Sequence, residues 1–140
     1  MNHWLYKNKK VTCLADIENN ESIIGFVYQI TNKTTGKIYI GKKVLHTSRK
    51  TRISKKEKAA TATRKTFKRI VKESDWLTYW GSCKPLLEEI KQLGENNFKR
   101  EILEFCCTKK YLSFAEIEHQ IKNDVLKRDT YNGNILSRYF

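Results

Sequence analysis

Two short strand patterns joined by a polar turn dominate the fold that this chain can adopt. Residues 23–31 read IIGFVYQIT and are rich in β-branched and aromatic side chains, and residues 37–41 read KIYIG. The residues between them, 32–36 (NKTTG), are polar and end in glycine, as turns commonly do. Because so short a connection joins neighbouring antiparallel strands, the sequence predicts a β-hairpin over residues 23–41.

A strongly basic segment follows this hairpin. Residues 42–72 hold 13 Lys or Arg and one acid, Glu57, and their few apolar residues show no sustained periodicity. Such a charge run is typical of a solvated or ligand-binding segment. We therefore expect a basic insertion here, with a short helix around Ala59 to Val71.

The segment after the insertion predicts a helix. Ser82 is expected to cap a helix that runs to about Leu93, with Pro85 in its first turn and Gly94 at its end. The residues expected to face inward are Leu86, Leu87, Ile90 and Leu93.

The C-terminal part predicts a third strand and a last helix. Residues 98–105 (FKREILEF) suit a strand, and their pattern is also compatible with a helix. Thr108 or Ser113 can cap a helix that continues through Leu126. The stripe expected to face inward is Phe114, Ile117, Ile121 and Val125. The element order predicts an α+β fold, with a small three-stranded antiparallel sheet flanked by helices.

Length and charge indicate one domain with an anionic partner. The 140 residues suit a single domain, 1–140, with an N-terminal extension at 1–22 and the basic insertion at 42–72. A net charge of +13 destabilises a compact state by self-repulsion, so nucleic acid, an anionic membrane or an acidic protein is expected to offset it.

Membrane, export and zinc signals are missing from the sequence. No segment approaches the roughly 18 apolar residues of a membrane span, and residues 1–10 lack the apolar stretch of a signal peptide. We expect an intracellular protein that is not secreted, with reduced, buried or half-buried cysteines. The four cysteines and three histidines are not spaced to form a zinc site.

The predicted hairpin places Tyr28 and Tyr39 on adjacent strands. With the run GFVYQITNKTTGKIYIGKK, the segment SDWLTYWGS, the strand FKREIL and the terminal Tyr131-Asn132, this pattern resembles the GIY-YIG nucleases. It is closest to the phage Seg-type homing endonucleases, and the resemblance covers about residues 23–135. One departure is that Phe26 and Val27 stand where the family name has Gly and Ile.

The resemblance implies a metal-dependent endonuclease that hydrolyses phosphodiester bonds in double-stranded DNA. In this family one divalent ion, Mg²⁺ or Mn²⁺, is held by a glutamate, and no small-molecule cofactor is used. Tyr28 is then the general base and Tyr39 contacts the phosphate. A phenol has a pKa of about 10, so a tyrosine base needs nearby positive charge to lower it. If the enzyme is phage-encoded, it would act in the cytoplasm of a bacterial host.

Two glutamates compete for the metal. Glu116 is the first choice, because the AEIEHQ segment then matches the related helices best. The alternative is that Glu116 closes a capping box with Ser113, which would leave Glu118 as the ligand. Successive helical residues turn by about 100°, so the two carboxylates point roughly 200° apart and cannot both face the hairpin.

The remaining implied site residues are cationic or amide side chains. The catalytic arginine falls on Arg49 by the family's spacing, while Arg52, Arg64 and Arg69 remain alternatives, and Asn132 matches the terminal asparagine or is a turn residue before Gly133. His46 and His119 could assist proton transfer. The residues expected to bind DNA are Lys42, Lys43, Arg64, Lys65, Lys68 and Arg69.

Two other functions fit the same sequence. One is a catalytically silent nucleic-acid-binding module, and the other is a structure-specific repair or restriction nuclease on the same scaffold. The target, the choice between a nick and a double-strand break, and the oligomeric state are left open by the sequence.

Overall fold

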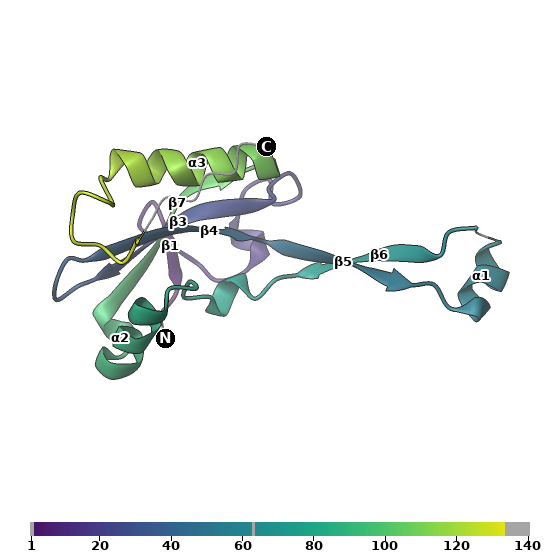
Figure 1. Cartoon of the computed structure of the whole chain (residues 1–140), viewed down its shortest axis with the longest axis horizontal. Coiled ribbons are helices and arrows are strands. Elements are labelled where there is room, and N and C mark those ends of the chain that lie inside the picture. The colour runs from purple at the N-terminus through teal and green to yellow at the C-terminus, as the bar shows by residue number, and fades with distance from the viewer. Residues whose placement is uncertain (1, 63, 134–140) are drawn as a thin grey trace.

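The fold is α+β, as predicted, and a computed structural model describes residues 2–62 and 64–133 of it (Figure 1). The strands are β1 (Trp4–Tyr6), β2 (Lys9–Val11), β3 (Gly25–Asn32), β4 (Ile38–Val44), β5 (His46–Arg52), β6 (Phe67–Glu73) and β7 (Phe98–Cys106). The helices are α1 (Lys55–Thr61), α2 (Lys84–Leu93) and α3 (Lys109–Lys122), with 3-10 turns η1 (Leu14–Asp16), η2 (Trp76–Thr78) and η3 (Glu95–Asn97).

The central sheet has five strands in the order β2-β1-β7-β3-β4. The predicted hairpin β3–β4 and the predicted strand β7 are present, and both of their pairings are antiparallel. The prediction of three strands was too small, because the N-terminal extension folds into a β1–β2 hairpin whose strand β1 pairs parallel to β7. Three-residue strands beside a lysine-rich turn show too little alternation to be recognised.

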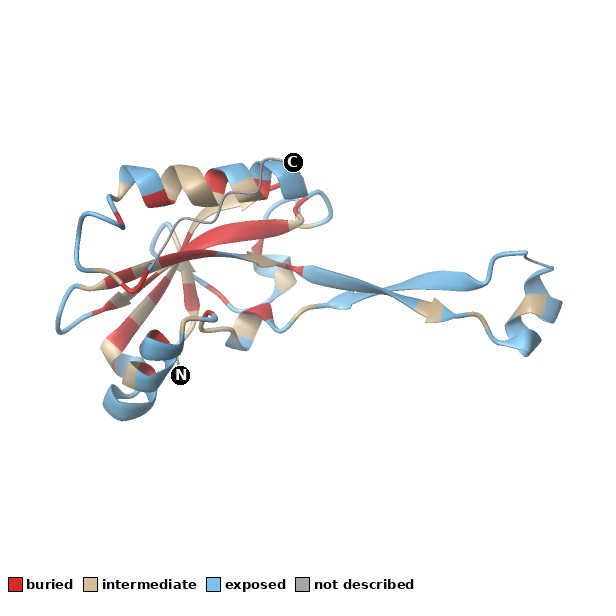
Figure 2. Ribbon diagram, viewed as in Figure 1, coloured by how far each residue is buried: buried red, intermediate tan, exposed pale blue. Residues whose placement is uncertain are grey.

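Two apolar layers cover the two faces of the sheet (Figures 1 and 2). On one face, Phe26 and Tyr28 pack with Trp76 of η2 and Leu86 of α2. On the other face, β3 and β4 pack under Leu112 and Ala115 of α3. Alternation along β3 therefore sends Tyr28 toward the α2 side and Val27 toward the α3 side.

The basic insertion forms a two-stranded ribbon that extends away from the sheet (Figure 1). Strands β5 and β6 pair antiparallel, and α1 lies at the tip. The predicted helix around residues 59–71 was therefore wrong. The helix begins earlier because Ser54 caps it by accepting from the Glu57 N–H (3.2 Å), and it ends at Ala62, whose φ is +52°.

Helix α2 differs from its prediction at one end and on one face. Cys83, not Ser82, occupies the N-cap position, while Pro85 in the first turn and Gly94 at the end are as expected. Leu86 and Ile90 are buried, but Leu87 and Leu93 are exposed.

Helix α3 begins at its Thr108 cap and ends at Lys122, four residues before the predicted end. Its predicted inward stripe was half wrong: Phe114 and Ile121 are 55% and 59% exposed, whereas Val125 is buried and Ile117 is half-buried. The buried residues of the helix are instead Leu112, Ala115 and Gln120. A polar residue faces inward because α3 lies beside the β4 edge, where the Gln120 amide donates to the Ile40 carbonyl (3.1 Å).

All four cysteines are free thiols. Cys83 and Cys106 are at least partly buried, whereas Cys13 and Cys107 are exposed, contrary to expectation. Within residues 2–62 and 64–133, no helix has the length and apolar character needed to cross a membrane.

Candidate active site

The two hairpin tyrosines meet on the α2 side of the sheet. Tyr28 lies directly opposite Gly41 in the β3–β4 register, and the ring centroids of Tyr28 and Tyr39 are 6.1 Å apart. Tyr79, which follows η2, packs edge-on against Tyr28 at 6.0 Å. The sheet and the η2 segment therefore bring three phenols together.

Two glycines make room for these rings. A Cβ at Gly41 would lie 2.5 Å from the Tyr28 hydroxyl oxygen and 3.1 Å from Cε1 of Tyr39. A Cβ at Gly81 would lie 3.3 Å from the same hydroxyl, and Gly81 also has a φ of +88° that favours glycine. The Tyr28 hydroxyl thus points at a place where both flanking backbones lack side chains.

The electrostatic setting of the tyrosines differs from the expected one. Tyr28 is 1% exposed, and burial, followed by its neighbours Tyr39 and Tyr79, raises its pKa far above the ordinary value. Burial also raises the pKa of Tyr39, although a hydrogen bond from Ser82 acts in the opposite direction. The expected lowering by nearby cations is not seen, and both phenols are neutral in the protein alone.

Glu116 lies on the side of α3 that faces the sheet edge. Its carboxylate accepts a hydrogen bond from the backbone N–H of Lys42, and burial raises its pKa while the Lys42 charge lowers it. The helix begins at Lys109, so Ser113 is not its cap and the capping-box alternative fails. Ser113 Oγ instead accepts a hydrogen bond from Lys42 Nζ (2.9 Å).

Glu118 has a different environment. Its carboxylate lies 3.7 Å from Lys122 Nζ, one helical turn further along α3. The two glutamates therefore point apart, as the helical geometry requires. Glu116 is the one whose charge acts on both Tyr28 and Tyr39.

Backbone groups of Ile38, Ile40 and Lys42 along the outer edge of β4 form hydrogen bonds with residues from other parts of the chain. The Tyr131 N–H donates to the Ile38 carbonyl (2.9 Å), and the Asn132 side chain accepts from the Ile40 N–H and donates to the Ile40 carbonyl (2.9 Å each). The Glu116 carboxylate accepts a hydrogen bond from the Lys42 N–H. The predicted Asn132 thus contacts the strand between Tyr39 and Gly41 and not the phenols, so its contacts position that strand.

The donor set at this edge suits a hard divalent ion. Among the described residues, no group of three or more His, Cys, Asp or Glu side chains could by itself hold a metal ion. Mg²⁺ commonly binds through one or two carboxylates and otherwise keeps water and substrate phosphate oxygens as ligands. The single, partly desolvated carboxylate of Glu116 suits an ion that is bound through one carboxylate and otherwise by water and phosphate oxygens.

The predicted arginines lie elsewhere. Arg49 and Arg52 are on β5, Arg69 is on β6 and Arg64 precedes β6, so all four belong to the exposed ribbon. At about 3.3 Å per residue, the eight residues from Gly41 to Arg49 span up to roughly 26 Å of extended chain. The structure does not bring these arginines to the tyrosines.

The predicted DNA-binding lysines divide into two groups. Lys43 lies beside the phenols, 2.6 Å from an Asp75 oxygen and 4.0 Å from the centroid of the Tyr79 ring, and Lys42 is held by Ser113. Lys65 and Lys68 are on the ribbon. His46 is also on the ribbon, while His119 contacts Glu104 (3.1 Å).

A family model matches nearly the whole chain. The family model described as "Putative endonuclease segE, GIY-YIG domain" matches residues 4–139. The chain belongs to the SegE GIY-YIG family. Searches of curated proteins and of solved structures each gave no match. Membership places the chain among nucleases, whose substrates are nucleic acids.

The match to the SegE GIY-YIG family begins within the N-terminal segment. Residues 4–11 are therefore part of the family domain, in agreement with the β1 and β2 strands that they form in the sheet. Arg100 ties this segment to the site, since its guanidinium donates to the carbonyls of Asn2, Leu77 and Tyr79 (2.6 to 3.0 Å).

Sequence reasoning missed Tyr79 and Arg100. Tyr79 lies in the YWGS segment that carried the resemblance, so its position in a shared motif was a usable signal. Arg100 is buried on β7 and stacks on Trp4 and Trp80, and burial lowers its pKa to about 10. Nothing in a strand pattern distinguishes such an arginine from a surface one.

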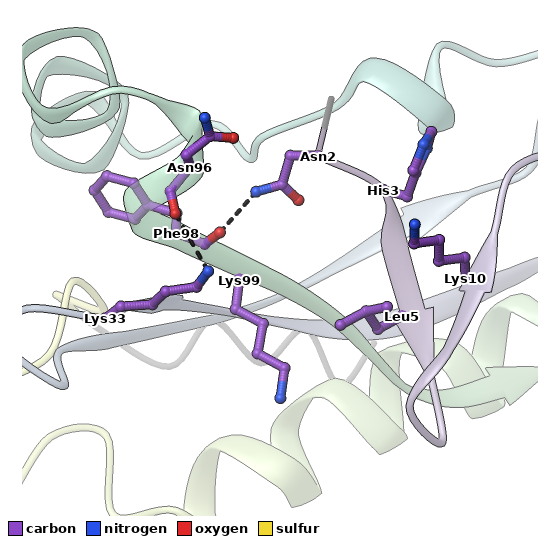
Figure 3. A pocket seen from close by; sticks show the side chains of 8 residues that line it. All are labelled: Asn2, His3, Leu5, Lys10, Lys33, Asn96, Phe98 and Lys99. Carbon is purple, nitrogen blue, oxygen red and sulfur yellow. Dashed lines mark hydrogen bonds between the residues drawn. The ribbon is translucent and has the colours of Figure 1, made fainter.

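A separate hollow of about 260 Å³ lies beside β1, β2 and the start of β7 (Figure 3). Its lining includes Lys10, Lys33 and Lys99 but none of the tyrosines nor Glu116. Lys33 donates to the Asn96 carbonyl (3.2 Å) and Lys99 lies 3.6 Å from Glu101. Of these lysines, Lys99 lies near a carboxylate, and the hollow adds nothing to the tyrosine site.

Proposed function

We propose that this chain is a metal-dependent endonuclease that hydrolyses phosphodiester bonds in double-stranded DNA, of the phage homing type. The observation that carries the proposal is the packing of Tyr28 and Tyr39 beside Gly41, with Glu116 bound to the next residue of β4, Lys42, and its charge acting on both phenols. Family membership and the net charge of +13 support the same substrate class.

Each group has a role that its environment suits. Glu116 would hold Mg²⁺ or Mn²⁺, because a half-buried carboxylate with a raised pKa gains from a nearby cation. A bound ion of this kind would supply positive charge for the phosphate and for the attacking water. Lys42 and Lys43 lie close enough to this edge to bind a phosphate beside it.

The tyrosines are proposed to act on the water and the phosphate. Tyr39 is only partly buried and is the better placed of the two to contact a phosphate oxygen. Tyr28 can serve as the base only after losing its own proton, which burial opposes. Cleavage through Tyr28 is therefore expected to speed up as the pH rises.

The same burial favours a second candidate, a catalytically silent binding module. A phenol that stays neutral gives no base, and the remaining basic surface would still bind nucleic acid. The two candidates differ in one measurable property, cleavage that requires a divalent ion.

Incubation of the purified protein with supercoiled and linear DNA, in Mg²⁺ or in EDTA, tests the proposal. Cleavage in Mg²⁺ that disappears in EDTA supports the enzyme. DNA binding in a gel shift with no cleavage under Mg²⁺ or Mn²⁺ would support the silent module and contradict the enzyme.

A further inference from the structure

Among the described residues, no helix or second sheet covers either face of the ribbon of β5 and β6. All but one of its fourteen strand residues are exposed, including Phe67 and Val71 at 55% and 62% (Figure 2). A two-stranded hairpin with no layer packed on it is marginally stable in water. Apolar side chains held out on such a ribbon indicate a surface that another molecule covers.

The charge on the ribbon specifies the kind of molecule. Residues 46–73 carry 11 Lys or Arg and two acids, Glu57 and Glu73. Lys50 lies directly opposite Arg69 in the register, and like charges at such a pair destabilise a sheet. A polyanion between these side chains would turn this repulsion into attraction, and a nucleic acid has that charge.

The dimensions of the ribbon fit one groove of duplex DNA. Seven-residue strands at about 3.3 Å per residue extend roughly 23 Å, and the two strands lie about 4.8 Å apart. The major groove is about 12 Å wide and admits a two-stranded ribbon, whereas the minor groove is about half as wide. A length of 23 Å corresponds to about seven base pairs at 3.4 Å each.

Cross-strand pairing defines the two faces of the ribbon. Residues directly opposite each other share a face, so one face, here named the reading face, is made of His46, Ser48, Lys50, Arg52, Phe67, Arg69, Val71 and Glu73. Glu73 lies at the base of the ribbon and accepts a hydrogen bond from Trp76 Nε1 (2.8 Å), so the cations further along this face are not paired with it. The other, here named the tip-side face, is made of Thr47, Arg49, Thr51, Lys68, Ile70 and Lys72.

The two faces differ in how many of their side chains are already held by other parts of the protein. On the tip-side face, Lys68 is bound to Glu57 of α1 (2.5 Å) and Ile70 is 37% exposed. The reading face combines arginines, which pair with guanine, with the apolar Phe67 and Val71, which can contact thymine methyl groups. This mixture suits base edges better than phosphates alone.

We infer that the ribbon lies in the DNA major groove with the reading face against the base edges, and so selects the target sequence. The inference rests on the proposed function only in taking duplex DNA as the substrate. It goes beyond a phosphate-tracking role, because it requires discrimination among bases by Arg52 and Arg69.

Selection of bound duplexes in EDTA tests the inference without any cleavage. The probe is a pool of duplexes with 12 randomised central base pairs, and the bound fraction is sequenced. The wild-type chain should enrich a run of about seven positions. Arg69→Gln should lose preference at one or two of them and weaken binding to the selected duplex by about tenfold to a hundredfold.

Lys72→Gln is the matched control, since it removes an exposed cation from the same strand but from the tip-side face. It should weaken binding to all duplexes by a similar factor and leave the enriched run unchanged. Both positions are exposed, so circular dichroism should show a folded protein in each case.

Modified DNA identifies the groove. Replacing guanine by 7-deazaguanine removes the N7 acceptor from the major groove and should weaken wild-type binding, while distamycin in the minor groove should not compete. An absence of any enriched run, or competition by distamycin with no effect of 7-deazaguanine, would overturn the inference. Enrichment that persists in a protein without cleavage activity would contradict the proposed enzyme alone.

Discussion

Gly41→Ala should disable the site through a single methyl group. The added Cβ would lie 2.5 Å from the Tyr28 hydroxyl oxygen, 2.7 Å from Tyr28 Cζ and 3.1 Å from Tyr39 Cε1. These distances are below ordinary contact, and Tyr28 is buried among Trp4, Phe26 and Tyr79, so its ring cannot simply turn away. Overpacking of this kind costs about 1–3 kcal/mol of unfolding free energy. A displacement of about 1 Å at a reacting group can lower the rate by about a hundredfold.

Urea unfolding and single-turnover cleavage of a plasmid measure the two effects. Adding Tyr28→Phe to Gly41→Ala removes the closest contact, so it should recover part of the lost stability but not the cleavage. Gly133→Ala is the control, because a Cβ there meets no atom of residues 2–62 and 64–133 within 4 Å. Wild-type stability and wild-type cleavage in Gly41→Ala would refute the packing argument.

Four further outcomes are expected. Tyr28→Phe and Tyr39→Phe should each keep the fold and lower cleavage by about a hundredfold or more. Because burial raises the pKa of Tyr28, wild-type single-turnover cleavage rates should rise by up to about tenfold per pH unit from pH 6 to 9, and a flat profile would argue against Tyr28 as the base. Asn132→Ala removes both hydrogen bonds to Ile40, so urea unfolding should show a loss of about 1–3 kcal/mol, and an unchanged midpoint would show that the β4 edge needs no such partner. Neutralising four cations of the ribbon and its tip, Lys55, Lys56, Arg64 and Arg69, should flatten the slope of log K for DNA binding against log salt by about 3 to 4 units. An unchanged slope in filter binding would show that these cations make no phosphate contacts.

The parts of the fold that followed from the sequence are those with local signals. The β3–β4 hairpin had strand composition on both sides of a glycine-ended turn, and α2 had Pro85 and Gly94 at its ends. The β1–β2 hairpin and the ribbon lacked such signals, because lysines occupy many of their strand positions. Their pairing depends on contacts between residues far apart in the sequence or on a ligand.

The inward face of α3 illustrates a second limit. An apolar stripe predicts burial only where the helix packs on an apolar layer, as Leu112 and Ala115 of α3 do, and another part of α3 instead meets backbone groups of β4. Gln120 and Glu116 face inward to meet those groups, and Phe114 and Ile121 point outward. Of the two glutamates, Glu116 is the one that contacts the hairpin, through the Lys42 N–H, and its role as a metal ligand stays a prediction.

For the site, Tyr28 and Tyr39 lie side by side and the charge of Glu116 acts on both, whereas the arginines lie on the ribbon; the catalytic roles of all of them stay predictions. Counting eight residues from Gly41 presumes a helix after β4, but this chain continues into β5. Tyr79 and Arg100 join the site only through tertiary packing, which no local pattern reveals.

Comparing Glu116→Gln with Glu118→Gln tests the central claim most directly. Both changes remove one carboxylate charge from α3, but only Glu116 takes the Lys42 N–H and faces the tyrosines, while Glu118 pairs with Lys122. Duplex affinity is measured by gel shift in EDTA and strand scission in Mg²⁺ on the same preparations. We predict that Glu116→Gln binds DNA as tightly as the wild type or tighter and does not cut, whereas Glu118→Gln binds and cuts normally. Cleavage that survives in Glu116→Gln and disappears in Glu118→Gln would contradict the site at the β4 edge.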